Sequence, residues 1–296
     1  MPFSTNSARF LEQGPRPQLS PAHAQSRTVK FLTLAQELNS DMQLQQALRI
    51  AGTAMLGVAT DGVPLIIRLA SPDVTHVLIS GAKASGKTQL LRTVLGSLAL
   101  YQKPRELQFL VLAENASAYE FLTASPCMLG EIATTPEHAL QHLRWLETEL
   151  ERRENELVTR PRLVVAIDEG SEFLTNGGRE FQVHLTRLAQ RGRGVGISLL
   201  VCTNKAQASD LPAALRANFP VRLIGKHSSA NDGADKLAGR GDFILAAGGE
   251  RVRFQAAYLA PQEATWFHAQ LCEWRVRPQP RESGLHSFVR RLQRVK

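Results

Sequence analysis

The chain has 296 residues, of which 43% are hydrophobic and 21% are charged, and it carries a formal net charge of +8. A chain of this length can bury one large core, and no apolar run approaches the ~18 residues that a membrane span requires, so we expect no membrane insertion of its own. The widely spaced cysteines and the lack of a secretory signal argue against a disulfide framework and favour a cytoplasmic location. The excess of Lys and Arg favours a polyanionic partner without identifying it.

The predicted elements follow one another in a regular order. A short helix is expected at 41–50, and a hairpin at 55–69 turns at Asp61-Gly62. A strand at 77–80 leads through a glycine-containing loop into a helix at 88–101. The remaining segments are a strand at 108–113, an amphipathic helix at 134–158, and strands at 163–168, 197–202 and 221–225. Short apolar strands that alternate with helices predict an α/β fold with a mostly parallel central sheet and helices on both faces.

Four segments of the chain differ in composition. Residues 1–28, rich in Pro, Gln and Ser, predict a flexible N-terminal segment. Residues 29–70 are expected to form a small lead-in of a helix and a hairpin that packs on the core. Residues 71–270 hold the alternating strands and helices of the main domain. Residues 271–296 carry an excess of arginine and predict a basic C-terminal tail.

The most informative motif is the loop at 81–88, which reads G-x-x-x-x-G-K-T directly after an apolar strand. Its glycines let the backbone curl so that successive N–H groups face phosphate oxygens, and the following helix adds the positive end of its dipole. In this pattern Lys87 reaches the terminal phosphates and the Thr88 hydroxyl binds Mg²⁺. The residues predicted to bind the nucleotide are Gly81, Ala82, Lys83, Ala84, Ser85, Gly86, Lys87, Thr88 and Gln89.

A second element with chemical meaning is the apolar run at 163–167, which ends in Asp168 and Glu169. A buried central strand delivers such residues to the C-terminal edge of a parallel sheet, where ligands bind. There Asp168 would hold Mg²⁺, and Glu169 would activate the attacking water as a general base. A strand that ends in two acids is common by itself, but a phosphate loop earlier in the chain makes hydrolysis the stronger interpretation.

The nucleotide is predicted to be ATP. Proteins that switch with GTP often select guanine with an N-K-x-D motif, and residues 204–207 match this motif only in part because Gln207 replaces the acid.

Several later segments occur in an order that resembles one known family. The run L-A-Q-R-G-R-G-V-G-I ends at Ile197, and it is followed by L-R-A-N-F-P-V-R at 215–222 and by G-R-G-D-F-I-L at 239–245. Together with the phosphate loop, these segments resemble the motor domain of the FtsK/SpoIIIE family of DNA-translocating ATPases. The similarity covers residues 57–259. It implies that residues 71–270 form a RecA-like ATPase motor domain, which uses ATP and Mg²⁺ to translocate double-stranded DNA.

The resemblance also implies roles for residues outside the loop. Arg193 matches the arginine that reaches a neighbouring subunit's nucleotide, where its planar, permanent charge would stabilise the transferring phosphoryl group. This role requires a homo-oligomer, for which a hexameric ring is one candidate. Asn204 matches the family's sensor position, and Lys205 and Arg216 match basic residues that face DNA; phosphate contacts of that kind position a duplex without reading its sequence. The predicted catalytic set is Lys87, Asp168, Glu169, Arg193 and Asn204.

The sequence also departs from the family pattern. Asn204 stands where the family has the longer Gln, and Ala206 and Ala230 replace a Pro and a basic residue of the DNA-facing surface. Too few residues follow the core for the winged-helix domain of long family members, so we expect a stand-alone motor domain. Two alternatives stay open: an ATPase of a secretion or conjugation system that moves protein or relaxase-bound DNA, and a slowly hydrolysing, nucleotide-dependent DNA-binding adaptor.

Overall fold

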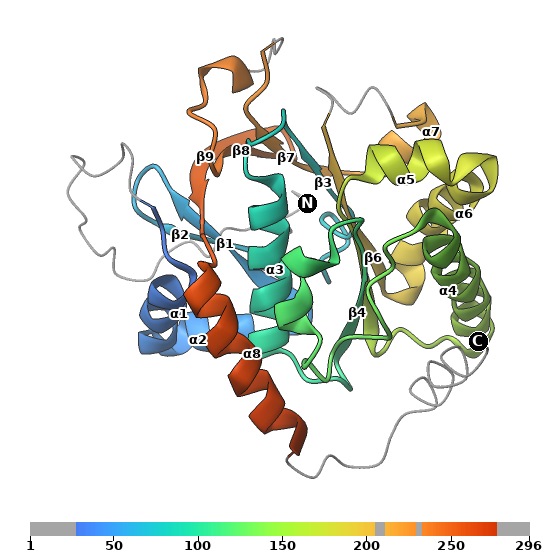
Figure 1. Ribbon diagram of the computed structural model, residues 1–296, viewed down its shortest axis with the longest axis horizontal. Coiled ribbons are helices and arrows are strands. Elements are labelled where there is room, and N and C mark those ends of the chain that lie inside the picture. Colours follow the sequence, from blue (N-terminus) through green and yellow to red (C-terminus); the bar gives the residue numbers. More distant parts are fainter. Residues whose placement is uncertain (1–27, 205–210, 229–232, 277–296) are drawn as a thin grey trace, which may run out of the picture.

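The computed structural model describes residues 28–204, 211–228 and 233–276, which form an α/β fold around one nine-stranded sheet (Figure 1). The order of the strands across the sheet is β2-β1-β9-β8-β7-β3-β6-β5-β4. Nearly all of the predicted N-terminal segment and most of the predicted basic tail lie outside the described residues.

The strands are β1 (Thr53–Ala59), β2 (Pro64–Arg68), β3 (Val77–Ser80), β4 (Leu107–Leu112), β5 (Arg162–Ile167), β6 (Ile197–Thr203), β7 (Val221–Gly225), β8 (Asp242–Ala247) and β9 (Glu250–Ala256). The helices are α1 (Phe31–Ser40), α2 (Met42–Leu48), α3 (Lys87–Tyr101), α4 (Pro136–Glu156), α5 (Gly170–Asn176), α6 (Gly178–Arg191), α7 (Ala213–Arg216) and α8 (Pro261–Val276). Short 3₁₀ turns are η2 (Ala116–Ala118), η3 (Glu120–Leu122), η4 (Gly192–Val195) and η6 (Ala234–Lys236).

The sheet is mixed. From β7 through β3, β6 and β5 to β4 all neighbours are parallel, whereas β2, β1, β9 and β8 pair antiparallel with each other and β8 pairs antiparallel with β7. The turn at Gly248-Gly249, with φ values of 58° and 86°, joins β8 to β9, and so short a turn can connect only antiparallel strands. The predicted α/β class is confirmed, and parallel pairing occupies the half of the sheet that begins at β7.

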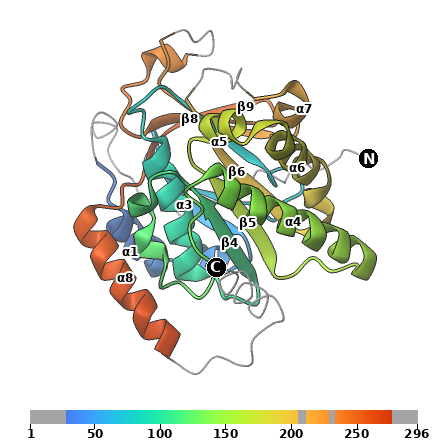
Figure 2. The same ribbon diagram turned by 45° about the vertical axis from the view of Figure 1, so that its right-hand side comes forward.

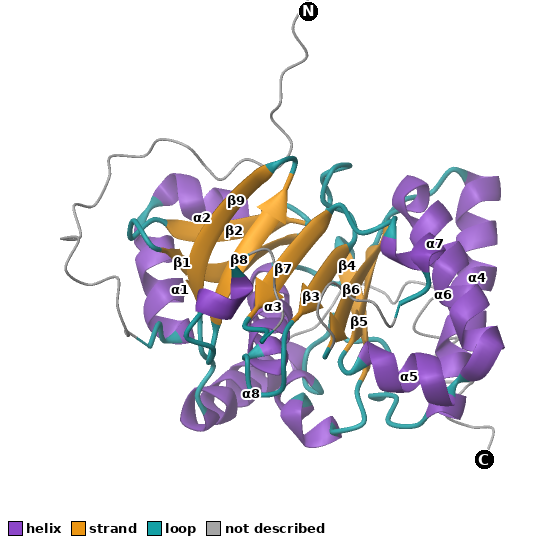
Figure 3. Cartoon of the chain, turned by 90° about the horizontal axis from the view of Figure 1, so that it is seen from above, coloured by secondary structure: helices purple, strands orange, loops and turns teal. Residues whose placement is uncertain are grey.

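Helices cover both faces of the sheet (Figures 2 and 3). On one face α3, α1 and α8 pack over a core that includes Phe31, Leu91 and Phe267. On the other face α4, α5 and α6 contribute side chains such as Leu143 and Phe181 to a second core. Since β5 is covered on both faces, its residues after the first are all buried, which explains the continuous apolar run in the sequence.

The elements for which the sequence predicted bounds agree with the structure to within a few residues. The structure adds helices α1, α5, α6, α7 and α8 and strands β8 and β9, and α8 extends to residue 276, so it includes the first residues of the segment expected to be a tail. The hairpin of the predicted lead-in joins the main sheet because β1 pairs with β9. Within the described parts of the chain, no helix combines the length and apolar character needed to cross a bilayer.

A buried arginine of α4, Arg153, connects this helix to the turn that precedes β6. Arg153 has no exposed surface, and its Nε donates to Glu149 Oε1 at 2.6 Å. The two terminal nitrogens of the same guanidinium donate to the Val195 carbonyl at 3.0 Å and to the Pro161 carbonyl at 2.7 Å. The guanidinium is removed from water, so these bonds satisfy a charged group that would otherwise be costly to bury.

Replacement of this arginine should therefore destabilise the fold. Arg153→Met is expected to lower the free energy of unfolding by about 3 kcal/mol, because Glu149 and the carbonyls of Val195 and Pro161 each lose a hydrogen bond donated by the buried guanidinium. The adjacent Arg152 contacts the same Glu149 carboxylate, but 40% of its side chain is exposed. Arg152→Met should cost at most about 1 kcal/mol. Urea denaturation of both variants measures the difference, and equal losses would contradict the role assigned to burial.

Candidate nucleotide-binding site

The phosphate loop runs from the end of β3 to the start of α3, and neighbouring turns hold its shape. The N–H of Ala82 donates to the Lys226 carbonyl at 2.8 Å, and the N–H of Gly241 donates to the Ser85 carbonyl at 2.8 Å. Gly86 has a φ of 106°, and a Cβ at this position would lie 2.6 Å from the backbone nitrogen of Gly241. Only glycine fits there, so the phosphate loop packs closely against the backbone of the G-R-G-D turn.

Lys87 and Thr88 begin α3 at the end of the loop. The Lys87 ammonium group donates to the carbonyls of Gly81 at 2.8 Å and Ala82 at 3.0 Å, which keeps it at the loop. Burial lowers the pKa of Lys87, and the nearby acidic groups act in the opposite direction. The site thus holds a buried cation at the N-terminus of a fifteen-residue helix, an arrangement that favours anions.

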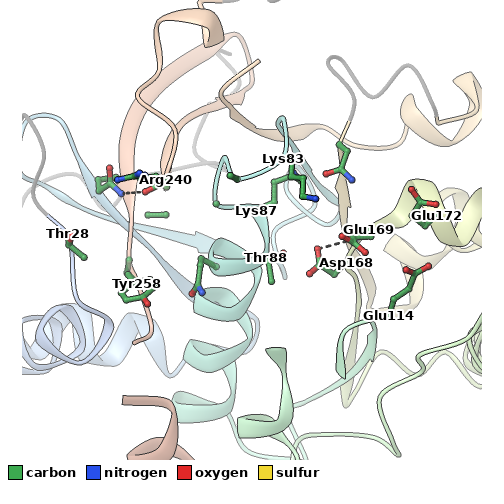
Figure 4. Close-up of a pocket in the computed structure, with 18 residues that line it drawn as sticks. Thr28, Lys83, Lys87, Thr88, Glu114, Asp168, Glu169, Glu172, Arg240 and Tyr258 are labelled. Atoms are coloured by element: carbon green, nitrogen blue, oxygen red, sulfur yellow. Dashed lines mark hydrogen bonds between the residues drawn. The ribbon is translucent and has the colours of Figure 1, made fainter. Parts of the chain in front are cut away.

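Strand β5 delivers Asp168 and Glu169 to the side of the phosphate loop (Figure 4). Asp168 is only 6% exposed and accepts hydrogen bonds from the Tyr119 hydroxyl at 2.8 Å and from the Glu169 N–H at 3.1 Å. Glu169 has a φ of 53°, a left-handed conformation that costs a non-glycine residue energy and is enriched at functional sites. Burial raises the pKa of Glu169, and the carboxylates of Asp168, Glu114 and Glu172 raise it further. A carboxylate with a raised pKa is a better proton acceptor.

These elements enclose a pocket of about 850 Å³, a size typical of small-molecule sites. In Figure 4 the loop lies at its centre, with the carboxylates on one side and Thr28, Arg240 and Tyr258 on the other. The predicted residues that line the pocket are Lys83, Ala84, Gly86, Lys87, Thr88, Gln89, Asp168, Glu169 and Asn204. Since the reacting phosphate is expected beside the carboxylates, the opposite side is left for the ribose and the base.

The side chains present fit a nucleotide with Mg²⁺. Thr88 and Asp168 offer hydroxyl and carboxylate oxygens, which this ion prefers. The Ser85 hydroxyl is buried in the loop and makes no hydrogen bond to another described residue, so it can donate to a phosphate oxygen. Among the described residues, no three His, Cys, Asp or Glu side chains form a metal site of their own. A Mg²⁺ ion would therefore need phosphate oxygens to complete its ligands.

Arg193 lies far from the phosphate loop of its own chain. It is exposed in η4, immediately before β6. Strands β6 and β3 are parallel neighbours. Because Arg193 precedes β6 and the loop follows β3, they lie at opposite ends of these strands. At about 3.3 Å per residue, β6 alone separates them by roughly 20 Å. If Arg193 acts on a nucleotide, that nucleotide belongs to another subunit.

The residues predicted to contact DNA do not lie at the pocket or are outside the described residues. Arg216 ends α7, is half-buried, and does not line the pocket. Lys205 lies outside the described residues, as does Ala230. Their proposed roles therefore rest on the sequence.

The structure adds pocket residues that the motifs did not single out. Glu172 lies in the first turn of α5, four residues after Asp168, and Arg240 lies in the G-R-G-D turn, so both stand in or beside a motif of the sequence. Glu114 lies two residues after the end of β4, at the same edge as the other carboxylates. Tyr258 of the pocket had no such signal, and neither had Tyr119, which lies outside the pocket lining and contacts Asp168, because their positions depend on contacts between segments distant in the chain.

Together the fold and the phosphate loop are those of P-loop nucleotide-binding proteins. Solved structures with the same fold include the pCW3 conjugation coupling protein TcpA, with a TM-score of 0.64 and 20% identity over 76% of this chain and 71% of that chain. The cytoplasmic domain of the type VII secretion ATPase EccC from Thermomonospora curvata has a TM-score of 0.66 and 23% identity over 90% of this chain and 34% of that chain. At these identities the likeness shows the fold alone.

Within this class the chain is similar to the FtsK/SpoIIIE family, whose sequence model matches residues 40–160. The DNA translocase FtsK of Treponema pallidum is 28% identical over 258 residues, which cover 76% of this chain and 32% of that protein. The DNA translocase SftA of Bacillus subtilis is 29% identical over 269 residues, which cover 80% of this chain and 28% of that protein. The resemblance inferred from the motifs is confirmed, and the chain spans about a third of the length of these relatives.

Proposed function

We propose that the protein hydrolyses ATP and uses the energy to translocate double-stranded DNA. The observation that carries the proposal is the pocket in which the phosphate loop faces Asp168 and Glu169. Lys87 and the loop N–H groups would bind the phosphates, and Thr88 and Asp168 would hold Mg²⁺, which neutralises charge on the transferring phosphoryl group. Glu169 would accept a proton from the attacking water. Asn204, which lines the pocket, would sense the γ-phosphate.

Two observations support DNA as the substrate. The curated relatives are named DNA translocases, and the net charge of +8 favours a polyanion. Lys205 and Arg216 would contact the DNA backbone and thus position a duplex of any sequence. Such a motor would act in the cytoplasm.

The active form would be a homo-oligomer. Arg193 lies at the edge of the sheet opposite to its own phosphate loop, so it can complete only the site of a neighbouring subunit. A closed ring satisfies every site in this way, and a hexamer is one such ring. The motor domain of each subunit would span residues 71–270, with residues 29–70 as its lead-in.

The ATPase rate with and without duplex DNA tests this function. We expect duplex DNA to stimulate turnover at about 50 mM salt, and the stimulation to fade at about 200 mM salt because backbone contacts release counterions. Lys87→Ala provides the background rate. Arg216→Ala should weaken the stimulation and leave the rate without DNA unchanged.

Two outcomes would contradict the translocase. Turnover that is indifferent to DNA would favour an ATPase that moves protein. Turnover near the background, with DNA still retained by the protein, would favour a nucleotide-dependent adaptor.

A further inference from the structure

We propose that Tyr119 is a positioning residue, which fixes the orientation of the Asp168 carboxylate for binding of Mg²⁺. The inference rests on the proposed ATPase function, in which Asp168 holds the ion. It concerns a residue that lies outside the phosphate loop and outside the pocket lining.

The hydrogen bonds of Asp168 are distributed over both of its carboxylate oxygens. The Tyr119 hydroxyl, which is fully buried, donates to Oδ2 at 2.8 Å, and the Glu169 N–H donates to Oδ1 at 3.1 Å. The buried Cys202 thiol also makes a hydrogen bond with this carboxylate. Each carboxylate oxygen can accept about two hydrogen bonds or metal contacts, so at least one direction is left for the ion or its water. The carboxylate cannot rotate about its terminal bond without breaking at least one of these bonds.

The segment that carries Tyr119 is itself held in place. Tyr119 joins the 3₁₀ turns η2 and η3, and its carbonyl accepts the N–H of Leu122 at 2.9 Å. The ring of Phe121 packs edge-on against Phe267 of α8, with 5.7 Å between centroids. The Arg92 guanidinium of α3 lies over the same Phe121 ring, 5.1 Å from its centre. A hydroxyl on so fixed a segment can hold Asp168 in one orientation.

A simpler explanation is that Asp168 only satisfies a buried hydroxyl. The two explanations differ in what loss of the hydroxyl changes. If the bond is only structural, its loss lowers stability and affects nucleotide binding equally with and without Mg²⁺. If the bond orients a metal ligand, the loss appears in the Mg²⁺ dependence, since removal of the groups that orient metal ligands typically lowers metal affinity by about 10- to 100-fold.

The test uses the full chain with Tyr119→Phe, which keeps the buried ring and removes only the hydroxyl. Binding of a fluorescent, non-hydrolysable ATP analogue is measured in EDTA and over a range of Mg²⁺ concentrations. We expect the affinity in EDTA to stay within about twofold of the wild type, and the Mg²⁺ concentration at the midpoint to rise about tenfold. The matched control is Tyr101→Phe: this tyrosine also lies on the α3 side of the sheet, and its hydroxyl bonds to the Ala35 carbonyl at 3.4 Å and to Asn39, not to a residue of the pocket. Both quantities should be unchanged in this control.

Thermal unfolding of each variant is measured first, so that binding is compared at a temperature at which all variants are folded. Phe121→Leu is a second variant, which loosens the segment and keeps the hydroxyl; it should raise the same Mg²⁺ midpoint by a smaller factor. An unchanged midpoint in Tyr119→Phe, or an equal loss of affinity with and without Mg²⁺, overturns the inference about Tyr119. A wild-type protein that does not bind the analogue, or whose affinity ignores Mg²⁺, overturns the proposed ATPase function instead.

Discussion

Glu169→Gln is expected to bind ATP almost as tightly as the wild type and to hydrolyse it at least about a hundredfold more slowly. Glutamine keeps the size of the side chain but cannot take a proton from water at neutral pH. Binding should persist because Lys87, Thr88 and Asp168 are unchanged. Single-turnover hydrolysis of labelled ATP, together with its equilibrium binding, measures both quantities on the same preparation.

The control for this variant is Glu151→Gln, an exposed carboxylate of α4 outside the pocket, which should turn over ATP at the wild-type rate. If Glu169→Gln hydrolysed ATP at that rate too, Glu169 would not be the general base. Glu114 and Glu172 lie on the same side of the pocket and would be the next residues to replace. If binding were lost as completely as turnover, the change would have disturbed the pocket, and the strained backbone at Glu169 would be the first place to look.

The parts of the site that sequence patterns predicted are those that local chemistry specifies. The loop at 81–88 needs glycine at Gly86 because its φ is 106°, and the run into Asp168 is apolar because β5 is covered on both faces. Each of these constraints acts over a few consecutive residues, so each leaves a readable pattern.

The parts that could not be predicted depend on pairing between distant segments. Nothing local to residues 53–59 indicates that β1 will pair with β9 and extend the main sheet. The same holds for Tyr119, whose bond to Asp168 joins residues 49 apart in the chain. For Arg193 the sequence predicted a role, and only the parallel register of β3 and β6 shows that its own loop is out of reach.

Arg193→Ala should leave nucleotide affinity within about twofold of the wild type and lower turnover by about a thousandfold, the smaller end of the effect of an arginine supplied to a neighbouring site. The reason is geometric: η4 lies at the edge of the sheet opposite to the loop, so Arg193 adds nothing to its own chain's binding pocket. Arg191→Ala is the matched control, because Arg191 lies two residues away and pairs with Glu154 on the surface. Its turnover should stay close to that of the wild type. An equal loss of binding and turnover in Arg193→Ala would contradict action in a neighbouring subunit.

A mixing experiment separates action between subunits from action within one. Lys87→Ala removes the ammonium group of the phosphate loop but keeps Arg193, and Arg193→Ala has the opposite defect. Each variant alone should be nearly inactive. In mixed oligomers, a subunit with an intact loop can stand beside one with an intact arginine, which restores complete sites, so the mixture should turn over ATP faster than either variant alone. If Arg193 served its own chain, every subunit in the mixture would stay defective and mixing would restore nothing.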